Sequence, residues 1–509
     1  MGTDDSAGTT PVLVPGKTCW KSAEADQFAV IIDGADYLRH VKAAMLRARH
    51  RIVVVGWDLD YRTTFERGET TLEGPNSLGL FLHWLLWRRR DLHVYLLKSN
   101  LRLLPAFDGF WFGVAPVSLL NQFTSARMHF AVDGAHPTGA VHHQKIVVVD
   151  DTMAFCGGMD LTLGRWDTSE HLPKDSRRNG PDGGYGPRHE VVTAVDGDAA
   201  KVLADQARDR WEAATGRVLP ALDPCSPAWP DRLEPHLSSV EVGVARTLPA
   251  LAARSEVREV ESLDLAAIAS ARDVIYLENQ YFAARNIAGA IAARLREPTG
   301  PEVVIILPRS SESRLEQESM DSARQRLFRL LKEADIHGRL GVYWPVAGGG
   351  VSVYVHSKVM AIDGRLLRIG SSNFNNRSLG FDSECDIAIE ARPERADYAA
   401  ISEEILRTRN RLVSEHLGVS PDEFRSEMQR SGSFLATVEA LRGTGRSLRA
   451  LTNTMVAADA SPFAENDLMD PGHVPQSIPE SALRLIETVI TWPFRHSILG
   501  TWYRKLRGS

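Results

Sequence analysis

Apolar residues along this chain fall into short segments that alternate between two spacings. Residues 36–48 place apolar side chains three and four positions apart, which predicts a helix, and residues 78–87 predict another. The runs at 51–57 and 92–98 are short and rich in Val, Leu and Ile, which is typical of buried strands. Strands that alternate with helices in this way predict a layered α/β fold.

The alternation stops near residue 215 and then begins again. Residues 215–237 hold five prolines and few periodic apolar positions, which predicts a linker or a wrapping loop. After it, residues 272–282 are interpreted as a strand, 287–295 as a helix and 303–308 as a strand. From about residue 420 the pattern is helical, so we expect a helical extension at the C-terminal end.

A polar motif occurs once in each part, at a constant distance from its copy. The first copy is His143-Gln144-Lys145 with Asp150, and the second is His356-Ser357-Lys358 with Asp363. The following turns, GGMD at 157–160 and GSSN at 370–373, belong to the same repeat, because their offset equals the one that separates His143 from His356. The repeat predicts two structurally equivalent halves. The residues expected to support the motifs are Asp150, Gly157, Gly158, Asp160, Asp363, Gly370 and Ser371.

The repeat defines five expected regions. They are a flexible tail (1–26), a first half (27–216), a linker (217–245), a second half (246–415) and a C-terminal helical extension (416–509).

The chemistry of the motif follows from its spacing. Residues two apart on a strand share a face, so each motif is expected to point its histidine and its lysine the same way. Two such motifs side by side would join two imidazoles and two ammonium groups. This set suits an anionic phosphodiester: one histidine attacks phosphorus, the other protonates the leaving oxygen, and the lysines stabilise the phosphate oxygens. Lysine is also scarce, because only ten of the 59 basic residues are lysines.

Composition excludes several classes of protein. With 509 residues, of which 43% are hydrophobic, the chain has enough apolar residues for packed cores, which excludes wholesale disorder. A net charge of −6 disfavours a dedicated nucleic-acid binder. The four cysteines are far apart and predict neither disulfides nor a zinc site, and we expect no metal and no cofactor.

The ends of the chain bear on localisation. The start is acidic and polar and lacks the apolar region of a secretory signal, and the longest apolar run is about ten residues, short of the ~20 that span a bilayer. We therefore expect a cytoplasmic protein. A C-terminal aromatic and cationic cluster is compatible with peripheral association with a membrane or with docking on the protein's own core. It consists of Trp492, Phe494, Arg495, Ile498, Leu499, Trp502, Tyr503, Arg504, Lys505 and Arg507.

Over residues 28–415 the paired motifs resemble the two HKD motifs of the phospholipase D superfamily. YLENQYF at 276–282, GSSN at 370–373 with Arg377-Ser378, and Asp382-Ser383-Glu384 are similar to the second half of true phospholipases D. GGMDL at 157–161 with GRWD at 164–167 is similar to the first half of the phosphatidylcholine-cleaving, eukaryotic-type branch. The resemblance implies two pseudo-symmetric α/β/α sandwich halves that share one active site.

The resemblance also implies roles for individual residues. His143 would form a phosphohistidine intermediate, and His356 would act as general acid and then as base. Lys145, Lys358 and Asn373 would hold the phosphate, although the first half has Asp160 where the second has Asn373. Glu384 is similar to the carboxylate that orients the family's histidine. The constant offset of the repeat places His171 at the equivalent position of the first half, so Asp167 or Glu170 would substitute, and we favour Asp167.

The implied activity is hydrolysis of a phospholipid at a membrane surface to phosphatidate and head group, with water or an alcohol as acceptor. We expect a monomer that binds no nucleic acid. The alternatives are a cardiolipin synthase-like phosphatidyltransferase, a nuclease or other phosphodiesterase of the same superfamily, and a catalytically silent binding protein on the same fold. Head-group and acyl-chain preference are not readable from the sequence.

Overall fold

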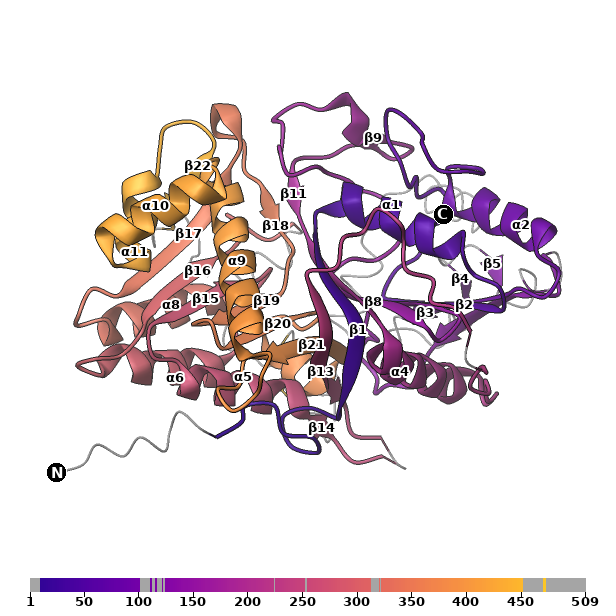
Figure 1. Cartoon of the computed structure of the whole chain (residues 1–509), viewed down its shortest axis with the longest axis horizontal. Helices are drawn as coiled ribbons and strands as arrows, with labels where there is room; N and C mark the ends of the chain where they lie inside the picture. The colour runs from indigo at the N-terminus through magenta and orange to yellow at the C-terminus, as the bar shows by residue number, and fades with distance from the viewer. Residues whose placement is uncertain are drawn as a thin grey trace, which may run out of the picture.

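A computed structural model describes residues 10–100, 110–111, 115–116, 121, 124–223, 225–251, 254–312, 320, 322–451 and 470–472 (Figure 1). One large mixed sheet runs through both halves, and helices cover its two faces. This arrangement confirms the α/β class predicted from the alternating pattern.

Among its described residues the first half has seven long strands and three helices. In chain order they are β1 (Lys21–Ile32), α1 (Gly34–Met45), β2 (Arg51–Gly56), α2 (Leu78–Arg88), β3 (His93–Ser99), β6 (Met128–Asp133), β7 (Ile146–Val149), β8 (Met153–Gly157), β12 (Val191–Asp196) and α4 (Gly197–Thr215). Short pairs complete it: β4 (Phe110–Trp111) with β5 (Ala115–Pro116), β9 (Asn179–Gly180) with β10 (Gly183–Gly184), and β11 (Arg188–His189), which pairs with a strand of the second half.

The second half repeats this order and adds a C-terminal unit. Its elements are β13 (Leu237–Leu248), β14 (Val257–Arg258), α5 (Glu259–Ser270), β15 (Val274–Glu278), α6 (Arg285–Arg296), β16 (Glu302–Ile306), α8 (Ser322–Ala334), β17 (Leu340–Val346), β18 (Tyr354–Val355), β19 (Val359–Ile362), β20 (Leu366–Gly370), β21 (Glu384–Glu390) and α9 (Tyr398–Leu417). The added unit is α10 (Pro421–Ser431), α11 (Phe434–Leu441) and β22 (Ser447–Ala450).

The strand order shows the pseudo-symmetry directly. From the centre outward the first half runs β1-β12-β8-β7-β2-β3-β6, and the second runs β13-β21-β20-β19-β15-β16-β17-β22. The halves join through β1 and β13, which pair antiparallel from Lys21 opposite Val244 to Phe28 opposite Leu237. Strands β7 and β19, which follow the two motifs, therefore occupy equivalent places on either side of the join.

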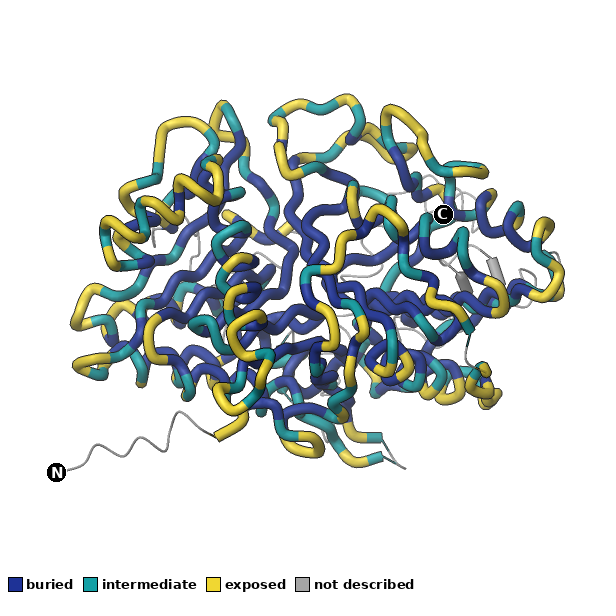
Figure 2. Tube along the Cα trace, viewed as in Figure 1, coloured by how far each residue is buried: buried dark blue, intermediate teal, exposed yellow. Residues whose placement is uncertain are grey.

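Apolar side chains pack on both faces of the sheet. One core is continuous across the halves and lies under α4 in the first half and under α9, α10 and α11 in the second. On the opposite face α1 and α2 cover the first half, and α5, α6 and α8 cover the second. Burial is deepest along the central strands (Figure 2). Two sandwiches on one sheet give the site between them a rigid support.

Two predicted region boundaries differ from the structure. Strand β1 begins at Lys21 and the backbone N–H of Val12 donates to the Glu390 carboxylate, so much of the predicted tail packs on the body. Strand β13 begins at Leu237, inside the predicted linker of 217–245. The prolines upstream led the sequence interpretation to extend the linker over an alternating strand. The aromatic and cationic cluster from Trp492 onward lies outside the described residues.

None of the helices that the structure describes is long and apolar enough to cross a membrane.

Candidate active site

The two motifs lie just before equivalent strands, where the halves meet. Residues 143–145 precede β7 and residues 356–358 precede β19, so the histidines and lysines are not inside regular strands as the sequence predicted. Their backbones bond across the join instead. The N–H of His143 donates to Ser383 O and that of His356 to His189 O, both at 2.9 Å. Each motif is thus held by a segment of the opposite half, and β11 lies beside β18 for this reason (Figure 1).

Each histidine also bonds to a carboxylate of the opposite half. His143 Nδ1 lies 3.0 Å from both oxygens of Glu384, which begins β21. His356 Nδ1 lies 3.0 Å from Glu190 Oε2, and Glu190 directly precedes β12. With Nδ1 occupied, the Nε2 atom of each ring is the nitrogen left for chemistry. The second half therefore orients the histidine of the first, and the first half orients the histidine of the second.

Asp167, which the sequence favoured as the first-half partner, lies elsewhere. Its carboxylate bonds to His171 Nδ1, to Arg178 Nη1 and to the N–H of Arg188. The prediction was wrong because the first-half segment between the motif turn and Glu190 is much longer than the second-half segment between its turn and Glu384. The extra length moves the counterpart of Glu384 down the chain, so the constant offset falls on His171. The position of Glu190 and Glu384, each at or directly before the start of an apolar strand, was a better signal for the two orienting carboxylates.

The two lysines have different partners. Lys145 Nζ lies 3.0 Å from Asp160 Oδ2 and donates to His143 O at 3.1 Å. Lys358 Nζ donates to the amide oxygen of Gln280 at 3.1 Å and to His356 O at 2.6 Å. The first lysine therefore has a carboxylate beside it, whereas the hydrogen bonds of the second go to neutral oxygens.

The residues after each motif also differ between the halves. Asp160 Oδ1 accepts from the N–H groups of Trp57 and Asp58 at 2.8 and 3.3 Å. At the equivalent position, Asn373 is buried and its Oδ1 has no hydrogen-bond partner among the described residues. An uncharged amide can donate from its NH2 group to a nearby anion, whereas a carboxylate can only accept.

Glycines in the motif turns allow close packing. A Cβ on Gly158 would lie 3.1 Å from His356 O and 3.2 Å from Lys358 Cδ, so this turn packs directly on the second motif. A Cβ on Gly370 would lie 1.9 Å from Asp386 Oδ1, and one on Gly157 would lie 2.7 Å from Val192 Cα. Ser371 fills its own turn with a hydroxyl that donates to Glu384 at 2.5 Å.

Asp150 and Asp363 fix backbone away from the histidines. Both have φ of 53° and both accept from three successive backbone N–H groups. For Asp150 these belong to residues 49–51, which lead into β2, and for Asp363 they belong to residues 272–274, which lead into β15. Their role is to fix the turn after each motif strand against its neighbour.

Burial and the neighbouring lysines set the charge of the site. The pKa of His143 is lowered well below 6.5 by burial and then by Lys145 and Lys358. The pKa of His356 is lowered in the same direction by burial, Lys358 and Arg165, with a contribution from Lys145. Each histidine thus feels the lysine of the other half, which places both motifs in one electrostatic site. The result is two neutral imidazoles at neutral pH.

The surrounding groups titrate unusually for the same reason. Burial raises the pKa of Glu384 to about 7 and raises that of Glu190. Burial lowers the pKa of Lys358 to about 7, against the opposing effect of Glu190. Groups with pKa values near 7 in one buried site are typical of acid–base catalysis.

Sequence reasoning missed Glu190, Gln280 and Arg188. Arg188 lies on β11, with Nε 3.4 Å from Glu190 Oε1 and with a bond to Glu312 at 2.7 Å. Only Gln280 had a visible signal, since it lies in the YLENQYF segment that carried the resemblance.

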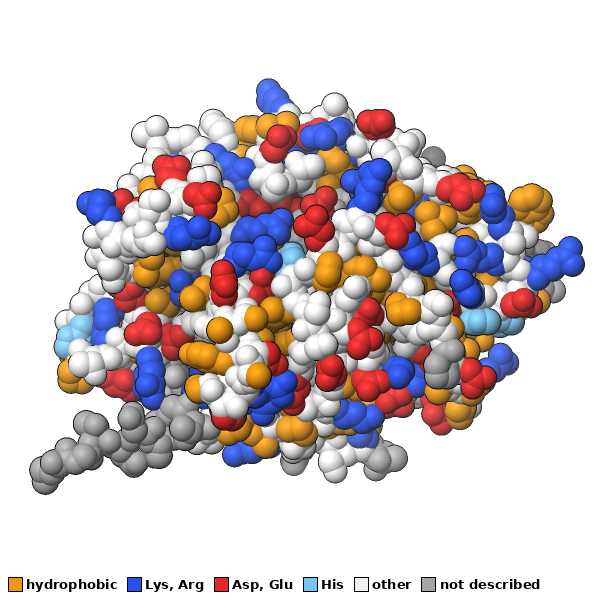
Figure 3. All heavy atoms as spheres, viewed as in Figure 1, with side chains coloured by type: hydrophobic (Ala, Val, Ile, Leu, Met, Phe, Trp, Pro, Cys, Tyr) orange, Lys and Arg blue, Asp and Glu red, His pale blue; other side chains and the backbone are white. Residues whose placement is uncertain are grey.

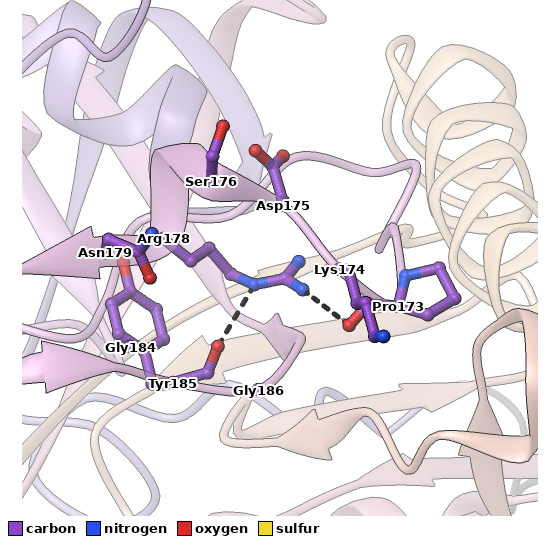
Figure 4. A pocket seen from close by; sticks show the side chains of 9 residues that line it. All are labelled: Pro173, Lys174, Asp175, Ser176, Arg178, Asn179, Gly184, Tyr185 and Gly186. Atoms are coloured by element: carbon purple, nitrogen blue, oxygen red, sulfur yellow. Dashed lines mark hydrogen bonds between the residues drawn. The ribbon is translucent and has the colours of Figure 1, made fainter.

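Residues 173–186 of the long first-half segment line an open pocket of about 460 Å³. Arg178 crosses it and donates to the carbonyls of Tyr185 and Pro173 at 3.3 and 3.2 Å (Figure 4). Because Arg178 also pairs with Asp167, the wall of this cavity is tied to the residues behind the site.

Among the described residues, two groups of histidines and carboxylates have their ligand atoms close enough to hold a metal ion. Neither group contains His143 or His356. Both lie behind the second motif, and within the described part of the chain the paired motifs themselves carry no such ligand set.

Known proteins resemble this chain along most of its length. The family model described as "Cardiolipin synthase, PLD-like domain" matches residues 265–406. "Phospholipase D A" of Dictyostelium discoideum is 25% identical over 55% of this chain, and the chain spans only 27% of that protein. "Cardiolipin synthase A" of Escherichia fergusonii is 26% identical over 77% of this chain and 72% of that protein.

A solved structure supports the fold. The phosphatidylserine synthase of Haemophilus influenzae superposes with a TM-score of 0.52 at 14% identity, covering 83% of this chain and 96% of that one. The predicted resemblance to the phospholipase D superfamily and the predicted fold are both confirmed.

Proposed function

We propose that this chain, which resembles the phospholipase D superfamily in sequence and fold, is an enzyme. It hydrolyses phospholipids to phosphatidate and head group through a phosphohistidine intermediate. The observation that carries the proposal is the crossed arrangement of the site. Two neutral histidines from different halves are each oriented at Nδ1 by a carboxylate of the opposite half, with a lysine beside each. That set matches the needs of a two-step displacement at a phosphodiester.

In the first step, His143 Nε2 attacks phosphorus and the P–O bond to the head group breaks. His356, whose protonated form the bound phosphate anion stabilises, supplies the proton that the leaving oxygen takes. The phosphatidyl group is then bonded to His143, and His356 is neutral. In the second step, His356 takes a proton from water or an alcohol, whose oxygen attacks phosphorus and breaks the P–N bond. Lys145, Lys358 and Asn373 stabilise the phosphate oxygens in both steps.

The assignment of His143 as nucleophile agrees with the exposure of the two rings. The His143 side chain is 16% exposed, whereas that of His356 is 5% exposed. The Trp57 ring lies 6.5 Å from that of His143 and provides an apolar wall on this side of the site. Either histidine is neutral at neutral pH in the free site, so the asymmetry of access favours His143 for the attack.

A phosphatidyl transfer to a second lipid is the alternative. The match of residues 265–406 to a cardiolipin synthase-type domain favours it. Both activities use the same intermediate and differ only in the acceptor of the second step. A nuclease is disfavoured by the net charge of −6, and the face drawn in Figure 3 carries interspersed acidic and basic side chains.

The experiment is an acceptor competition. Vesicles of phosphatidylcholine, phosphatidylethanolamine and phosphatidylglycerol are incubated with the protein and ethanol, and the lipid products are quantified by mass spectrometry. Phosphatidate and phosphatidylethanol, both lost in His143→Ala, are expected. Cardiolipin from phosphatidylglycerol as the main product would favour the transferase. Cleavage of plasmid DNA without lipid turnover would refute both.

A further inference from the structure

Four buried side chains from both halves converge directly behind the second motif. They are Asp33 after β1, His171 in the long first-half segment, His189 on β11 and Glu415 on α9, called the buried cluster below. Their side chains are 1–2% exposed or less, except for Glu415 at 8%. None of them takes part in the proposed phosphodiester chemistry.

The ligand atoms of the buried cluster lie at the separations of a tetrahedral metal site. Glu415 Oε1 lies 3.1 Å from His171 Nε2 and 3.0 Å from His189 Nδ1. Asp33 Oδ1 lies 3.3 Å from His189 Nδ1, and its Oδ2 lies 3.8 Å from His171 Nε2. A zinc ion with nitrogen and oxygen ligands at about 2.0–2.1 Å places these atoms about 3.3 Å apart.

The outward nitrogens of both histidines are held by further carboxylates. His171 Nδ1 lies 3.0 Å from Asp167 Oδ2, and His189 Nε2 lies 3.0 Å from Glu278 Oε2. Histidines that bind metals usually donate their second N–H to a carboxylate in this manner, because it fixes the ring and strengthens the ligand. This explains what Asp167 does, since it does not reach the active-site histidines.

One atom of the buried cluster has no hydrogen bond. Asp33 is 2% exposed, and its Oδ2 finds no hydrogen-bond partner among the described residues. A buried carboxylate oxygen without a donor is costly, and this one lies 3.8 Å from His171 Nε2. A cation at the centre would satisfy it.

We propose that Asp33, His171, His189 and Glu415 bind one divalent transition-metal ion of the zinc class. Two carboxylates and two neutral imidazoles with such an ion form a site of zero net charge, which suits a dry position. Three ligands come from the first half and one comes from α9 of the second, so the ion joins the halves. The proposal is independent of the substrate of the enzyme.

The site would stabilise the second motif without contacting the substrate. His189 O accepts the backbone N–H of His356, and Glu278, which holds His189, also accepts the hydroxyl of Ser357 at 2.6 Å. Loss of the ion is therefore expected to loosen the segment that carries His356 and Lys358. The alternative is a metal-free network in which both histidines are protonated and pair with the carboxylates.

Metal content and stability distinguish the two. The full chain, with any polyhistidine tag removed, is incubated with Zn²⁺. Unbound metal is removed by gel filtration, and the zinc content of the protein is measured by elemental mass spectrometry. About one zinc per chain is expected. The variants Glu415→Gln and His171→Gln should each lower the zinc content per chain at least tenfold. The control variants Glu403→Gln, at an exposed position on the same helix, and His337→Gln, at another exposed position, should leave the zinc content unchanged.

A second measurement on the unaltered protein covers the case in which those variants do not fold. A strong chelator should lower the melting temperature by about 5 °C or more, and added Zn²⁺ should restore it with release of protons. Less than 0.1 zinc per chain, with a melting temperature that neither chelator nor Zn²⁺ changes, would overturn the proposal. Zinc that stays at one per chain in both folded ligand variants would overturn it as well.

Discussion

The two motifs share their residues and their spacing, but they differ in what lies behind them. Behind the first motif, Gln144 bonds to the Gln206 side chain at 3.1 Å and to Glu384 O at 3.0 Å, all neutral groups. Behind the second, Ser357 bonds to the Glu278 carboxylate, which also bonds to Tyr276 at 2.5 Å and to His189 at 3.0 Å. The middle residue of the first motif therefore bonds to an amide and a backbone carbonyl, whereas that of the second bonds to a buried carboxylate in a charged network.

The two motif lysines also differ in the charge of the groups beside them. Lys145 is neutralised by Asp160, whereas the pKa of Lys358 falls to about 7 in a buried site with an amide beside it. A duplicated motif therefore does not imply two duplicated roles. The second motif is suited to gain and lose a proton, because the pKa of Lys358 lies near 7.

The largest effect that tests this difference is loss of either histidine. His143→Ala and His356→Ala should each lower turnover of a natural phospholipid by roughly 1,000-fold or more. Phosphatidyl-p-nitrophenol has a leaving group that needs no proton. With this substrate the first step should still occur in His356→Ala and release a burst of nitrophenol, measured by absorbance. His143→Ala should show no burst. The reverse pattern would exchange the roles of the two motifs.

The orienting carboxylates come next in size. Glu384→Gln and Glu190→Gln should each lower kcat by about 100- to 1,000-fold, because a histidine without its carboxylate loses its orientation and the stabilisation of its charged form. Asp167→Asn should change kcat less than fivefold, since Asp167 touches neither histidine. Steady-state assays on the three purified variants check this. A large kcat loss in Asp167→Asn with Glu190→Gln near normal would restore the assignment made from sequence.

The supports behind the motifs should differ in their contribution to stability. Glu278→Gln leaves His189, His416 and Ser357 with a weaker partner and should lower the free energy of unfolding by about 3 kcal/mol. Gln206→Leu removes the hydrogen bond to Gln144 and a long one of 3.5 Å from Arg246, and should cost about 1 kcal/mol. Urea unfolding followed by circular dichroism measures both. Equal losses would mean that the charged network adds nothing over the amides.

The smallest expected effect concerns pH. Because burial lowers the pKa of Lys358 to about 7, its ammonium is present below that pH and lost above it, so kcat/KM should fall at alkaline pH. Lys358→Arg should lower kcat/KM about tenfold at pH 7 and move the alkaline fall upward, because arginine stays protonated. Lys145→Arg should leave the position of the fall unchanged. An unchanged fall in Lys358→Arg would assign it to another group.

Much of the fold could be predicted from the sequence because its signals are local. The apolar spacing of residues 36–48 predicted the helix that runs from Gly34 to Met45, and the run at 51–57 predicted β2. The constant offset between the two motifs predicted the equivalence of β7 and β19. Each of these inferences depends on residues within one segment or on an exact repeat.

What failed depends on contacts between distant segments. Glu190 was missed because the first half carries a longer segment before β12, which broke the offset used to find it. The convergence of Asp33, His171, His189 and Glu415 joins positions that are far apart along the chain and has no pattern in the sequence. The position of His143 and His356 outside regular strands also depends on backbone bonds to the opposite half.

The central claim is that the two halves have different roles, the first binding the phosphatidyl group and the second moving the proton. The most direct test is to quench His356→Ala during reaction with phosphatidyl-p-nitrophenol and to locate the adduct by peptide mass spectrometry. In this variant the intermediate forms but lacks the base that removes it, so a phosphatidyl adduct on His143 is predicted. An adduct on another residue, or complete absence of an adduct while nitrophenol is released in a burst, would contradict the account.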